Sequence, residues 1–281
     1  MKKLLLSAAL AMGLAAPAVS QAQDEVNTGA LSLSGGVDYV TAYYFRGYNN
    51  AEAQLIIQPY ATLSVAILES DDVSITGNFG GWASVHSQHA GGAQGDSIYF
   101  EQDYYAWLDF AFGDFVLSTG YNIYTYPGNA YEDSTELSVK VAYDDSALME
   151  GAGVKFALKP YVLYVLELTG AGSGSADQDQ YLEVGIAPSF SAAGNVTVTV
   201  PVNLGMSADG YYLGSDGGNE TFGFWSVGVV GAVPLPIPTR YGTWSLSAGV
   251  TYIGLLADSA QASNPGDDYE IVGKVGISFS Y

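Results

Sequence analysis

The sequence predicts an all-β protein, a transmembrane antiparallel up-and-down β-barrel of about twelve strands, preceded by a cleaved signal peptide. Three observations predict this fold. Apolar and polar residues alternate along many segments, the connections between these segments alternate between long and short, and aromatic residues gather near the segment ends. Charged residues make up 13% of the chain, about half the usual share for a soluble domain. This low share is expected when much of the surface is out of water.

Residues 1–22 have the organisation of an export signal. A basic start precedes an apolar stretch over 4–14, and Ser20 and Ala22 place small residues at the two positions that a signal peptidase reads. The apolar stretch is too short to cross about 30 Å of hydrocarbon as a helix, which disfavours a membrane anchor. We therefore expect cleavage after Ala22 and a single barrel domain over 23–281.

Residues 196–206 give the clearest strand. The even positions carry valine, leucine or methionine, and the odd positions carry threonine, proline, asparagine or glycine. Residues 135–143 and 244–252 repeat the pattern, so one face of each strand is apolar and the other is polar or small. The expected strands are 30–44, 54–67, 73–86, 98–112, 115–126, 133–143, 153–167, 180–190, 195–206, 222–234, 243–256 and 268–281.

The connections between these strands carry an independent signal. Those after the odd strands are mostly long and rich in Gly, Asn, Asp and Ser, at 45–53, 87–97, 127–132, 168–179, 207–221 and 257–267. Those after the even strands are mostly shorter, at 68–72, 113–114, 144–152, 191–194 and 235–242. A transmembrane barrel shows this alternation, with external loops on one rim and periplasmic turns on the other.

A secreted β-sandwich is the alternative fold, because its strands also alternate, with the apolar face turned inward. The polar face of the expected strands is dominated by Ser, Thr, Gly, Asn and Tyr, which suits a wetted interior better than an exposed surface. Aromatic residues gather at 43–45 and 99–100 on the loop rim and at 110–115 on the turn rim. Such belts lie at the level of lipid headgroups and favour the membrane barrel.

The last strand carries Ile277, Phe279 and Tyr281 on one face and ends on an aromatic residue. This ending looks like the C-terminal signal by which bacterial outer-membrane barrels are recognised for assembly. We expect an integral outer-membrane protein whose partners are the outer-membrane lipids and, through Phe279 and Tyr281, the barrel-assembly machinery. The sequence is compatible with a monomer and with a trimer.

Several stretches resemble a known family. Residues 38–47 read DYVTAYYFRG and are similar to the SDYxFRG opening of the TorF-type porins. Residues 101–106 (EQDYYA), 124–128 (YTYPG) and 135–137 (TEL) resemble, in the same order, that family's acidic and aromatic strand, its YYPG loop and the strand that follows. The resemblance covers about 30–143 and implies a porin-like barrel.

If the apolar face meets lipid, the polar face lines the interior, and strand parity identifies the lining residues. About twelve strands leave room for a narrow aqueous passage. Acids outnumber bases along it, so we expect passive diffusion of small hydrophilic solutes with a preference for cations. The expected pore-lining residues are Asp38, Arg46, Glu101, Asp103, Tyr105, Asp109, Glu136, Lys140, Lys155, Lys159, Glu183 and Lys274.

Two other arrangements of these charges are open. In the first, acids and lysines pair across strands and plug the bore. The pairs would join Glu136, Glu183 and Glu270 to Lys140, Lys155, Lys159 and Lys274. The second concerns Arg46, which either braces the rim by pairing with Asp38 or Asp103 or orients a passing anion. Bracing is favoured, because an arginine among carboxylates seldom stays unpaired. A non-conducting structural or adhesive barrel with acidic loops is the alternative function.

Composition excludes several other function classes. The 29 acidic and 8 basic residues give a net charge of -21, which repels nucleic-acid phosphates. The absence of cysteine rules out thiolate nucleophiles and cysteine-ligated metals. A lipid hydrolase would need a serine activated by a histidine, and only His86 and His89 are available; we expect both to be exposed in a loop. We expect no catalytic residue, cofactor or metal site.

Overall fold

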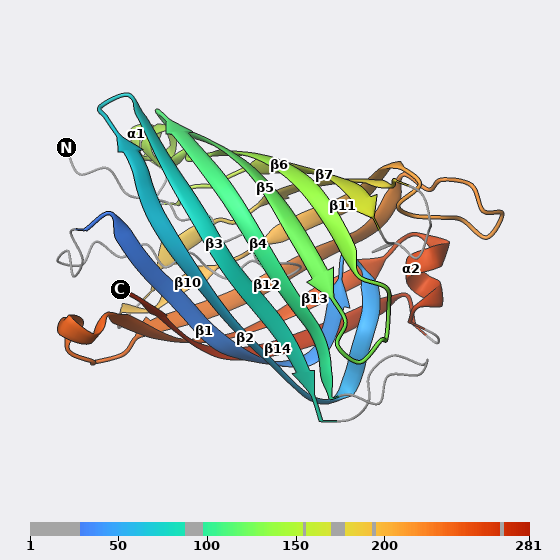
Figure 1. Cartoon of the computed structure of the whole chain (residues 1–281). Helices are drawn as coiled ribbons and strands as arrows, with labels where there is room; N and C mark the ends of the chain where they lie inside the picture. Colours follow the sequence, from blue (N-terminus) through green and yellow to red (C-terminus); the bar gives the residue numbers. More distant parts are fainter. Residues whose placement is uncertain (1–28, 88–97, 154–155, 170–177, 193–194, 265–266) are drawn as a thin grey trace.

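The computed structural model describes residues 29–87, 98–153, 156–169, 178–192, 195–264 and 267–281. In this part of the chain the strands form one closed antiparallel barrel (Figure 1), which confirms the predicted fold. The predicted signal peptide, 1–22, lies outside the described residues. The elements are β1 (Leu31–Phe45), β2 (Tyr48–Glu69), β3 (Val73–His86), β4 (Tyr99–Phe112), β5 (Phe115–Thr125), β6 (Ser134–Tyr143), α1 (Ser146–Gly151), β7 (Tyr161–Thr169), β8 (Gln180–Ile186), β9 (Ser189–Ser191), β10 (Thr197–Thr199), β11 (Val202–Asp209), β12 (Phe222–Pro234), the 3₁₀ segment η2 (Thr239–Tyr241), β13 (Thr243–Leu255), α2 (Asp258–Ala262) and β14 (Tyr269–Ser280).

Neighbouring strands pair along the chain, and β1 pairs with β14 to close the ring. The described residues form twelve barrel strands from fourteen segments, because two strands are interrupted. Pro188 separates β8 from β9, and Pro201 separates β10 from β11. A proline has no N–H to donate to the ladder, which accounts for both breaks. The ring continues past them, since β12 pairs with both β10 and β11.

The pleat gives the barrel an apolar outer face and a polar inner face. On β3, Phe79 is 56% exposed, whereas the adjacent Asn78 is buried; on β13, Val250 is 48% exposed and the adjacent Thr251 is buried. A closed ring of strands with this outer face satisfies all its backbone hydrogen bonds internally, as a lipid environment demands. Among the described residues, no helix is long and apolar enough to cross a membrane.

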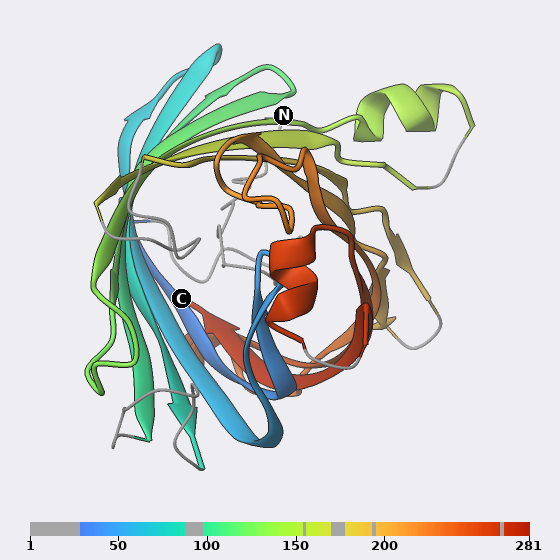
Figure 2. The same cartoon turned by 90° about the vertical axis from the view of Figure 1, so that its right-hand side faces the viewer.

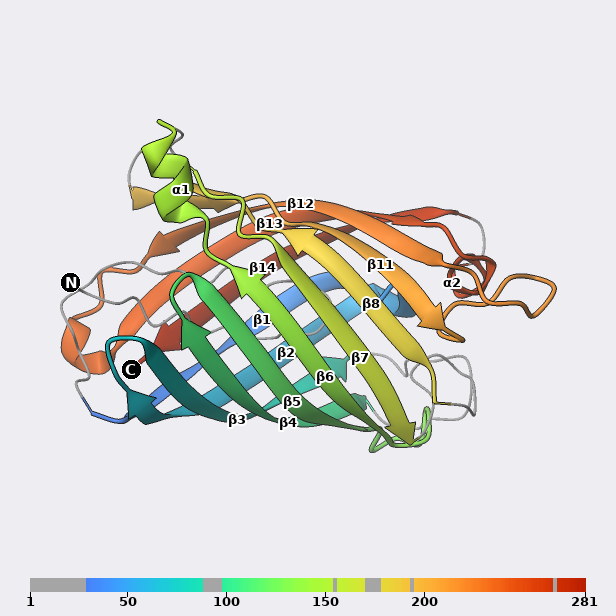
Figure 3. The same ribbon diagram turned by 90° about the horizontal axis from the view of Figure 1, so that it is seen from above.

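The two rims of the barrel differ in their connections. The turn rim carries 70–72, 113–114, 144–160 and 235–242 and lies at the left in Figure 1. There α1 projects sideways from the wall (Figure 3). The loop rim lies at the opposite end. Seen from that end, α2 and part of the segment 210–221 lie within the outline of the ring of strands (Figure 2), while the tip of the segment extends beyond the strand ends (Figure 3).

Three of the predicted segments differ from the structure. The sequence predicted a loop over 45–53, but β1 and β2 are joined by a turn of Arg46 and Gly47, whose φ angles of +48° and +84° allow a two-residue hairpin. The strand predicted over 153–167 begins only at Tyr161, directly after Pro160, which has no N–H to donate to the ladder. The predicted loop over 257–267 holds the short helix α2.

The apolar core fills the loop end of the interior. Its aromatic and aliphatic side chains come from strands on all sides of the ring and from the segment 210–221. Its largest members are Tyr43, Tyr44, Phe45, Ile56, Phe100, Tyr124, Tyr181, Tyr211, Tyr212, Phe224, Ile253 and Leu255. The middle of the interior is lined mainly by polar side chains, so the two halves of the bore differ in packing.

Candidate functional site

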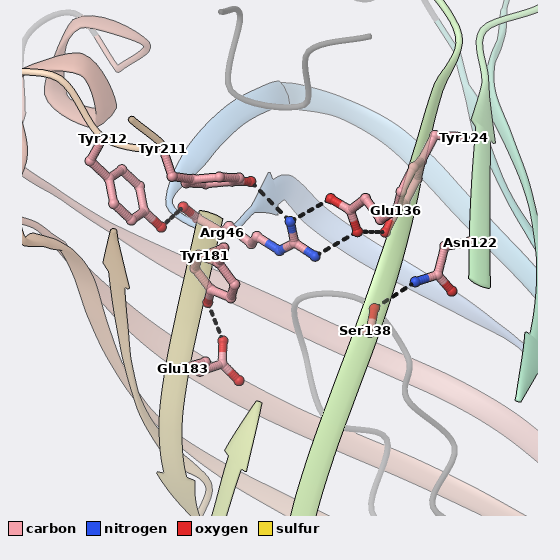
Figure 4. Close-up of polar contacts among 9 residues, drawn as sticks. All are labelled: Arg46, Asn122, Tyr124, Glu136, Ser138, Tyr181, Glu183, Tyr211 and Tyr212. Carbon is pink, nitrogen blue, oxygen red and sulfur yellow. Dashed lines mark hydrogen bonds and ion pairs between the residues drawn. The ribbon is translucent and has the colours of Figure 1, made fainter. Parts of the chain in front are cut away.

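Arg46 reaches the interior because of the turn that carries it. Its φ of +48° lies in the left-handed region, which non-glycine residues adopt only when their surroundings hold them there. One such constraint comes from Tyr212, whose hydroxyl donates to the Arg46 carbonyl at 2.7 Å. The side chain of Arg46 is then directed across the loop end of the barrel (Figure 4).

The guanidinium of Arg46 forms a two-pronged ion pair with Glu136, with Nη1–Oε1 at 2.6 Å and Nη2–Oε2 at 2.9 Å. Strands β1 and β6 lie five places apart in the sheet, so this pair crosses the bore. The hydroxyl of Tyr124 also donates to Glu136, at 2.7 Å. We call Arg46, Tyr124, Glu136, Tyr181, Tyr211 and Tyr212 the mouth cluster.

Aromatic rings enclose this ion pair. The Cζ atom of Arg46 lies 4.6 Å from the ring centre of Phe45, 4.5 Å from that of Tyr181 and 5.4 Å from that of Tyr211. Cation–π contacts of this kind strengthen when water is excluded, and the Arg46 and Glu136 side chains are only 9% and 1% exposed. Burial raises the pKa of Tyr211 well above its ordinary value, so its hydroxyl stays protonated beside the guanidinium.

The segment 210–221 and α2 are hydrogen-bonded to the β1–β2 hairpin and to each other. The hydroxyl of Tyr48 donates to the carbonyl of Tyr211 at 2.9 Å. The N–H of Leu213 donates to the Ser259 hydroxyl, and the N–H of Ser259 donates to the Leu213 carbonyl. Hairpin, segment and helix therefore form one connected layer at the loop end of the barrel, and Arg46, Tyr211 and Tyr212 of the mouth cluster belong to it.

A second group of acids lies beside the mouth cluster. Glu101 and Asp103 are 2% and 0% exposed and share the inner face of β4. The hydroxyl of Tyr43 donates to Glu101 at 2.8 Å. Neither carboxylate oxygen of Asp103 has a hydrogen-bond partner among the described residues. We call Glu101 and Asp103 the acid pair.

The charged residues in the middle of the bore make looser contacts along the wall. The Nζ of Lys274 lies 3.4 Å from Asp38 on the adjacent strand. On another part of the wall, Asp109 accepts from Asn78 at 2.8 Å and from Ser118 at 2.5 Å. These pairs join neighbouring strands and do not cross the interior.

Lys140 and Glu183 both contact the side chain of Tyr161. The Nζ of Lys140 lies 4.3 Å from the ring centre of Tyr161, and the Tyr161 hydroxyl donates to Glu183 at 2.6 Å and to Asn203 at 2.8 Å. The sequence predicted that lysines pair with Glu136, Glu183 and Glu270 and plug the bore. The described residues form no such ion pair, because Glu136 pairs with Arg46 and Lys274 pairs with Asp38.

Two aromatic side chains of β4 lie flat against the wall because glycine faces them. The ring of Tyr105 covers Gly80 on β3, and the indole of Trp107 covers Gly120 on β5; a Cβ at either glycine would overlap the ring. The hydroxyl of Tyr105 lies 2.7 Å from that of Thr62. These rings are directed along the wall and away from the centre of the bore.

The expectation that His86 is exposed in a loop is wrong. His86 is 1% exposed at the inner end of β3, where its ring stacks on Phe100 at 4.8 Å. Its Nε2 lies 2.8 Å from the Ser84 hydroxyl, but Nδ1 has no hydrogen-bond partner among the described residues. The serine is completely buried and no described third group orients the ring, so the geometry of a hydrolase is incomplete. His89 lies outside the described residues.

The structure places ten of the predicted pore-lining residues inside the ring. Nine lie on strands and Arg46 lies in the first turn. Lys159 lies instead in the 144–160 connection at the turn rim, and Lys155 lies outside the described residues. Arg46 pairs with Glu136, and not with Asp38 or Asp103 as the sequence suggested. That these residues line a conducting pore stays a prediction.

Sequence reasoning missed Tyr181, Tyr211, Glu167 and the buried Ser84–His86 contact. Strand parity could have indicated that three of these residues face inward. Ser84 and His86 lie two and four positions after Trp82 on β3, and Glu167 lies two positions after the buried Val165 on β7. Tyr211 lies beyond the end of β11, where alternation carries no information. Among the described residues, no group of three acidic or histidine side chains is placed to hold a metal ion.

No protein-family profile and no curated protein sequence matches this chain. An outer-membrane channel from Pseudomonas putida F1 has a similar structure, with a TM-score of 0.53, 10% identity, and coverage of 93% of this chain and 99% of that one. The NanC porin (TM-score 0.42, 11% identity, 89% and 99% covered) and the DcaP outer-membrane channel of Acinetobacter baumannii (0.40, 10%, 89% and 96%) are more distant. At these identities the first likeness shows a shared outer-membrane barrel fold.

Proposed function

We propose that this protein is a porin-like channel of the bacterial outer membrane through which small hydrophilic solutes diffuse passively. The observation that carries the proposal is the polar lining of the middle of the bore, where Asp38, Asp109, Lys140 and Lys274 face inward from strands around the ring. The fold shared with an outer-membrane channel supports it. The resemblance to the TorF-type porins over about 30–143 gives the finer family assignment that we propose.

Cation preference follows from the charges that face the interior. The inward-facing acids are Asp38, Glu101, Asp103, Asp109, Glu136, Glu167 and Glu183, and the inward-facing bases in the described residues are Arg46, Lys140 and Lys274. An acidic lining of low-dielectric walls raises the local concentration of cations and excludes anions. The mouth cluster would form the narrowest part of the path, because Arg46 and Glu136 cross the bore there.

Location and assembly are part of the same proposal. The apolar outer face contacts the lipids of the outer membrane, and the C-terminal strand, with Phe279 and Tyr281 on one face, is presented to the barrel-assembly machinery. Removal of the terminal aromatic, Tyr281→Ala, should lower the amount of heat-modifiable barrel in the outer membrane, measured by fractionation and gel migration.

The test of the channel is conductance of the refolded mature protein in a planar bilayer, with the reversal potential measured in a salt gradient. Discrete steps and a reversal potential of the cation-selective sign are expected. Neutralisation by Asp38→Asn and Asp109→Asn should move the reversal potential towards zero. Anion selectivity of the wild type would contradict the assignment of the acidic lining.

A non-conducting structural or adhesive barrel is the second candidate, and one observation favours it. The layer made by the β1–β2 hairpin, the segment 210–221 and α2 covers the mouth and is held by hydrogen bonds from all three. If this layer stays closed, the folded barrel gives no current steps. Recovery of conductance after deletion of 213–219 would then assign the closure to this layer.

A further inference from the structure

The loop end of the interior contains far more acid than base. Five carboxyl side chains there are between 0% and 3% exposed, and a single arginine accompanies them. The acids are Glu101, Asp103, Glu136, Glu167 and Asp179. Arg46 is committed to Glu136 by two short hydrogen bonds. Buried carboxylates are stable only when a positive charge, a set of hydrogen-bond donors or a proton compensates them.

The other bases of the chain are placed elsewhere. Lys274 lies beside Asp38 and Lys140 lies over Tyr161, both in the middle of the bore. Arg240 lies over Tyr241 at the turn rim, and Lys155 and Lys159 belong to the 144–160 connection. The loop segments 88–97 and 170–177, which lie outside the described residues, contain no lysine or arginine in their sequence. Among the described residues, no lysine or arginine is therefore placed to pair with Glu101 or Asp103, so these two acids are compensated by hydrogen-bond donors, by a proton or by a cation that binds from outside the chain.

Asp103 is the member of this group whose bonding is least complete. In the strand register it lies between Trp82 of β3 and Tyr124 of β5, on the inner face of the wall. It is 0% exposed, and neither of its carboxylate oxygens has a partner among the described residues. Glu101 accepts a hydrogen bond from Tyr43. The Nδ1 atom of His86 is likewise buried without a described partner.

The mouth cluster shows how this part of the barrel accommodates a cation. Around Arg46, a carboxylate accepts two N–H donors while aromatic rings cover the faces of the guanidinium. The acid pair also has aromatic neighbours, because Tyr43, which donates to Glu101, packs against Trp82 and Phe100. Carboxylate oxygens accept from N–H and O–H donors, and aromatic rings favour an organic cation over a hydrated metal ion.

We propose that Glu101 and Asp103 form a binding site for organic cations that carry N–H donors, namely alkylammonium or guanidinium groups. This inference rests on the proposed function, because it names the class of solute that the mouth selects. The cover that must move is the 126–133 connection, whose Tyr126 and Tyr131 lie against Phe100. Tyr131 is 47% exposed, so a ligand meets it first.

The test is calorimetric titration of the refolded mature barrel in detergent, at low salt and mildly alkaline pH, with methylguanidinium chloride. Tetramethylammonium chloride is the matched probe, because it has the same charge and no N–H donor. Saturable binding of methylguanidinium alone is expected. Asp103→Asn should weaken that binding about tenfold, the loss expected for one charge-assisted hydrogen bond.

Two further variants keep the result interpretable. Glu101→Gln should weaken binding in the same direction, and it provides a second reading if Asp103→Asn does not fold, which heat-modified gel migration reports. Asp114→Asn removes one charge from an exposed turn at the opposite rim and should leave binding unchanged. Equal binding of the two probes, absence of saturable binding, or equal effects of Asp103→Asn and Asp114→Asn would overturn the inference.

The same preparation separates this inference from the channel proposal. Binding by a barrel that gives no current steps would keep the site and refute the channel. Current steps from a barrel that binds neither probe would keep the channel and refute the site.

Discussion

Among the described residues, two ion pairs lie inside the barrel, and they differ in geometry. Arg46 and Glu136 make two contacts, at 2.6 and 2.9 Å, between strands five places apart. Lys274 and Asp38 make one contact, at 3.4 Å, between adjacent strands. The mouth pair therefore joins opposite walls, whereas the middle pair joins two neighbouring strands along the wall. The position of each residue in the ring decides whether its charge spans the interior or stays at the wall.

The largest effect should come from Arg46→Met, which breaks the mouth pair and leaves Glu136 buried with the Tyr124 hydroxyl as its remaining donor. Removal of one partner of a buried pair costs about 3–5 kcal/mol. Urea unfolding of the barrel in lipid vesicles should show this loss, and single-channel conductance should rise. A loss no larger than that of Lys274→Met would mean that the two pairs do not differ.

The packing of the middle wall can be tested at Gly120, where the indole of Trp107 leaves no room for a Cβ. Gly120→Ala should destabilise the barrel by about 1–3 kcal/mol through overpacking. Gly231→Ala is the matched control, because a Cβ there meets atoms only at 3.9 Å. Unfolding free energies of the two variants check the prediction, and equal values would show that the flat-lying ring is not a constraint.

Tyr212→Phe tests how much of the mouth depends on the hairpin turn. The change removes the hydrogen bond to the Arg46 carbonyl and should cost about 1 kcal/mol. The Arg46 backbone would lose one of its constraints, so more frequent opening events in current records are also expected. Tyr241→Phe, at a 58% exposed position on the turn rim, should change neither quantity.

Lys274→Met tests the middle ion pair in the same way that Arg46→Met tests the mouth pair. The pair with Asp38 makes a single contact of 3.4 Å between side chains that are 8% and 16% exposed, so its loss should cost about 1 kcal/mol, less than the loss of the mouth pair. Removal of the positive charge should nevertheless shift the reversal potential towards stronger cation selectivity. A large loss of stability with no change in selectivity would assign a bracing role to the middle pair as well.

The smallest effect concerns Asp145 in the 144–160 connection. Burial would raise the pKa of its carboxyl, but hydrogen bonds from the N–H groups of Lys159 and Leu158, together with the Lys159 charge, bring the pKa below its ordinary value of 3.8. A depressed folded-state pKa contributes stability above the unfolded-state pKa, and that contribution is lost as pH falls through the folded-state value. The stability difference between wild type and Asp145→Asn should therefore shrink as the pH falls below 3.8. A difference independent of pH would contradict this account.

Alternation predicted most of the barrel because it is a local property of a strand. The predicted strands 73–86 and 222–234 coincide with β3 and β12, and most other boundaries agree within a few residues. The turn at Arg46 and Gly47 was missed because an arginine at positive φ is uncommon and gives no pattern. The helices α1 and α2 were missed because each is too short to show helical periodicity.

The contacts of the candidate site could be predicted only in part. Parity identified which acids face inward, including Glu101, Asp103 and Glu136. The choice of Glu136 as the partner of Arg46 depends on the curvature of the closed ring, which no local pattern encodes. His86 was expected to be exposed with the glycine-rich loop that follows it, although it ends the predicted strand 73–86 in step with Trp82 and Ser84.

The mouth contacts join residues that are far apart in the chain, with separations of 90 positions for Arg46 and Glu136, 166 for Tyr212 and Arg46, and 220 for Tyr44 and Asn264. Contacts of such long range carry a large loop-closure entropy until the intervening chain is ordered. We therefore expect the layer over the mouth to form late in folding, after β1 has paired with β14. A barrel in which this layer is formed would then be one whose ring is already closed.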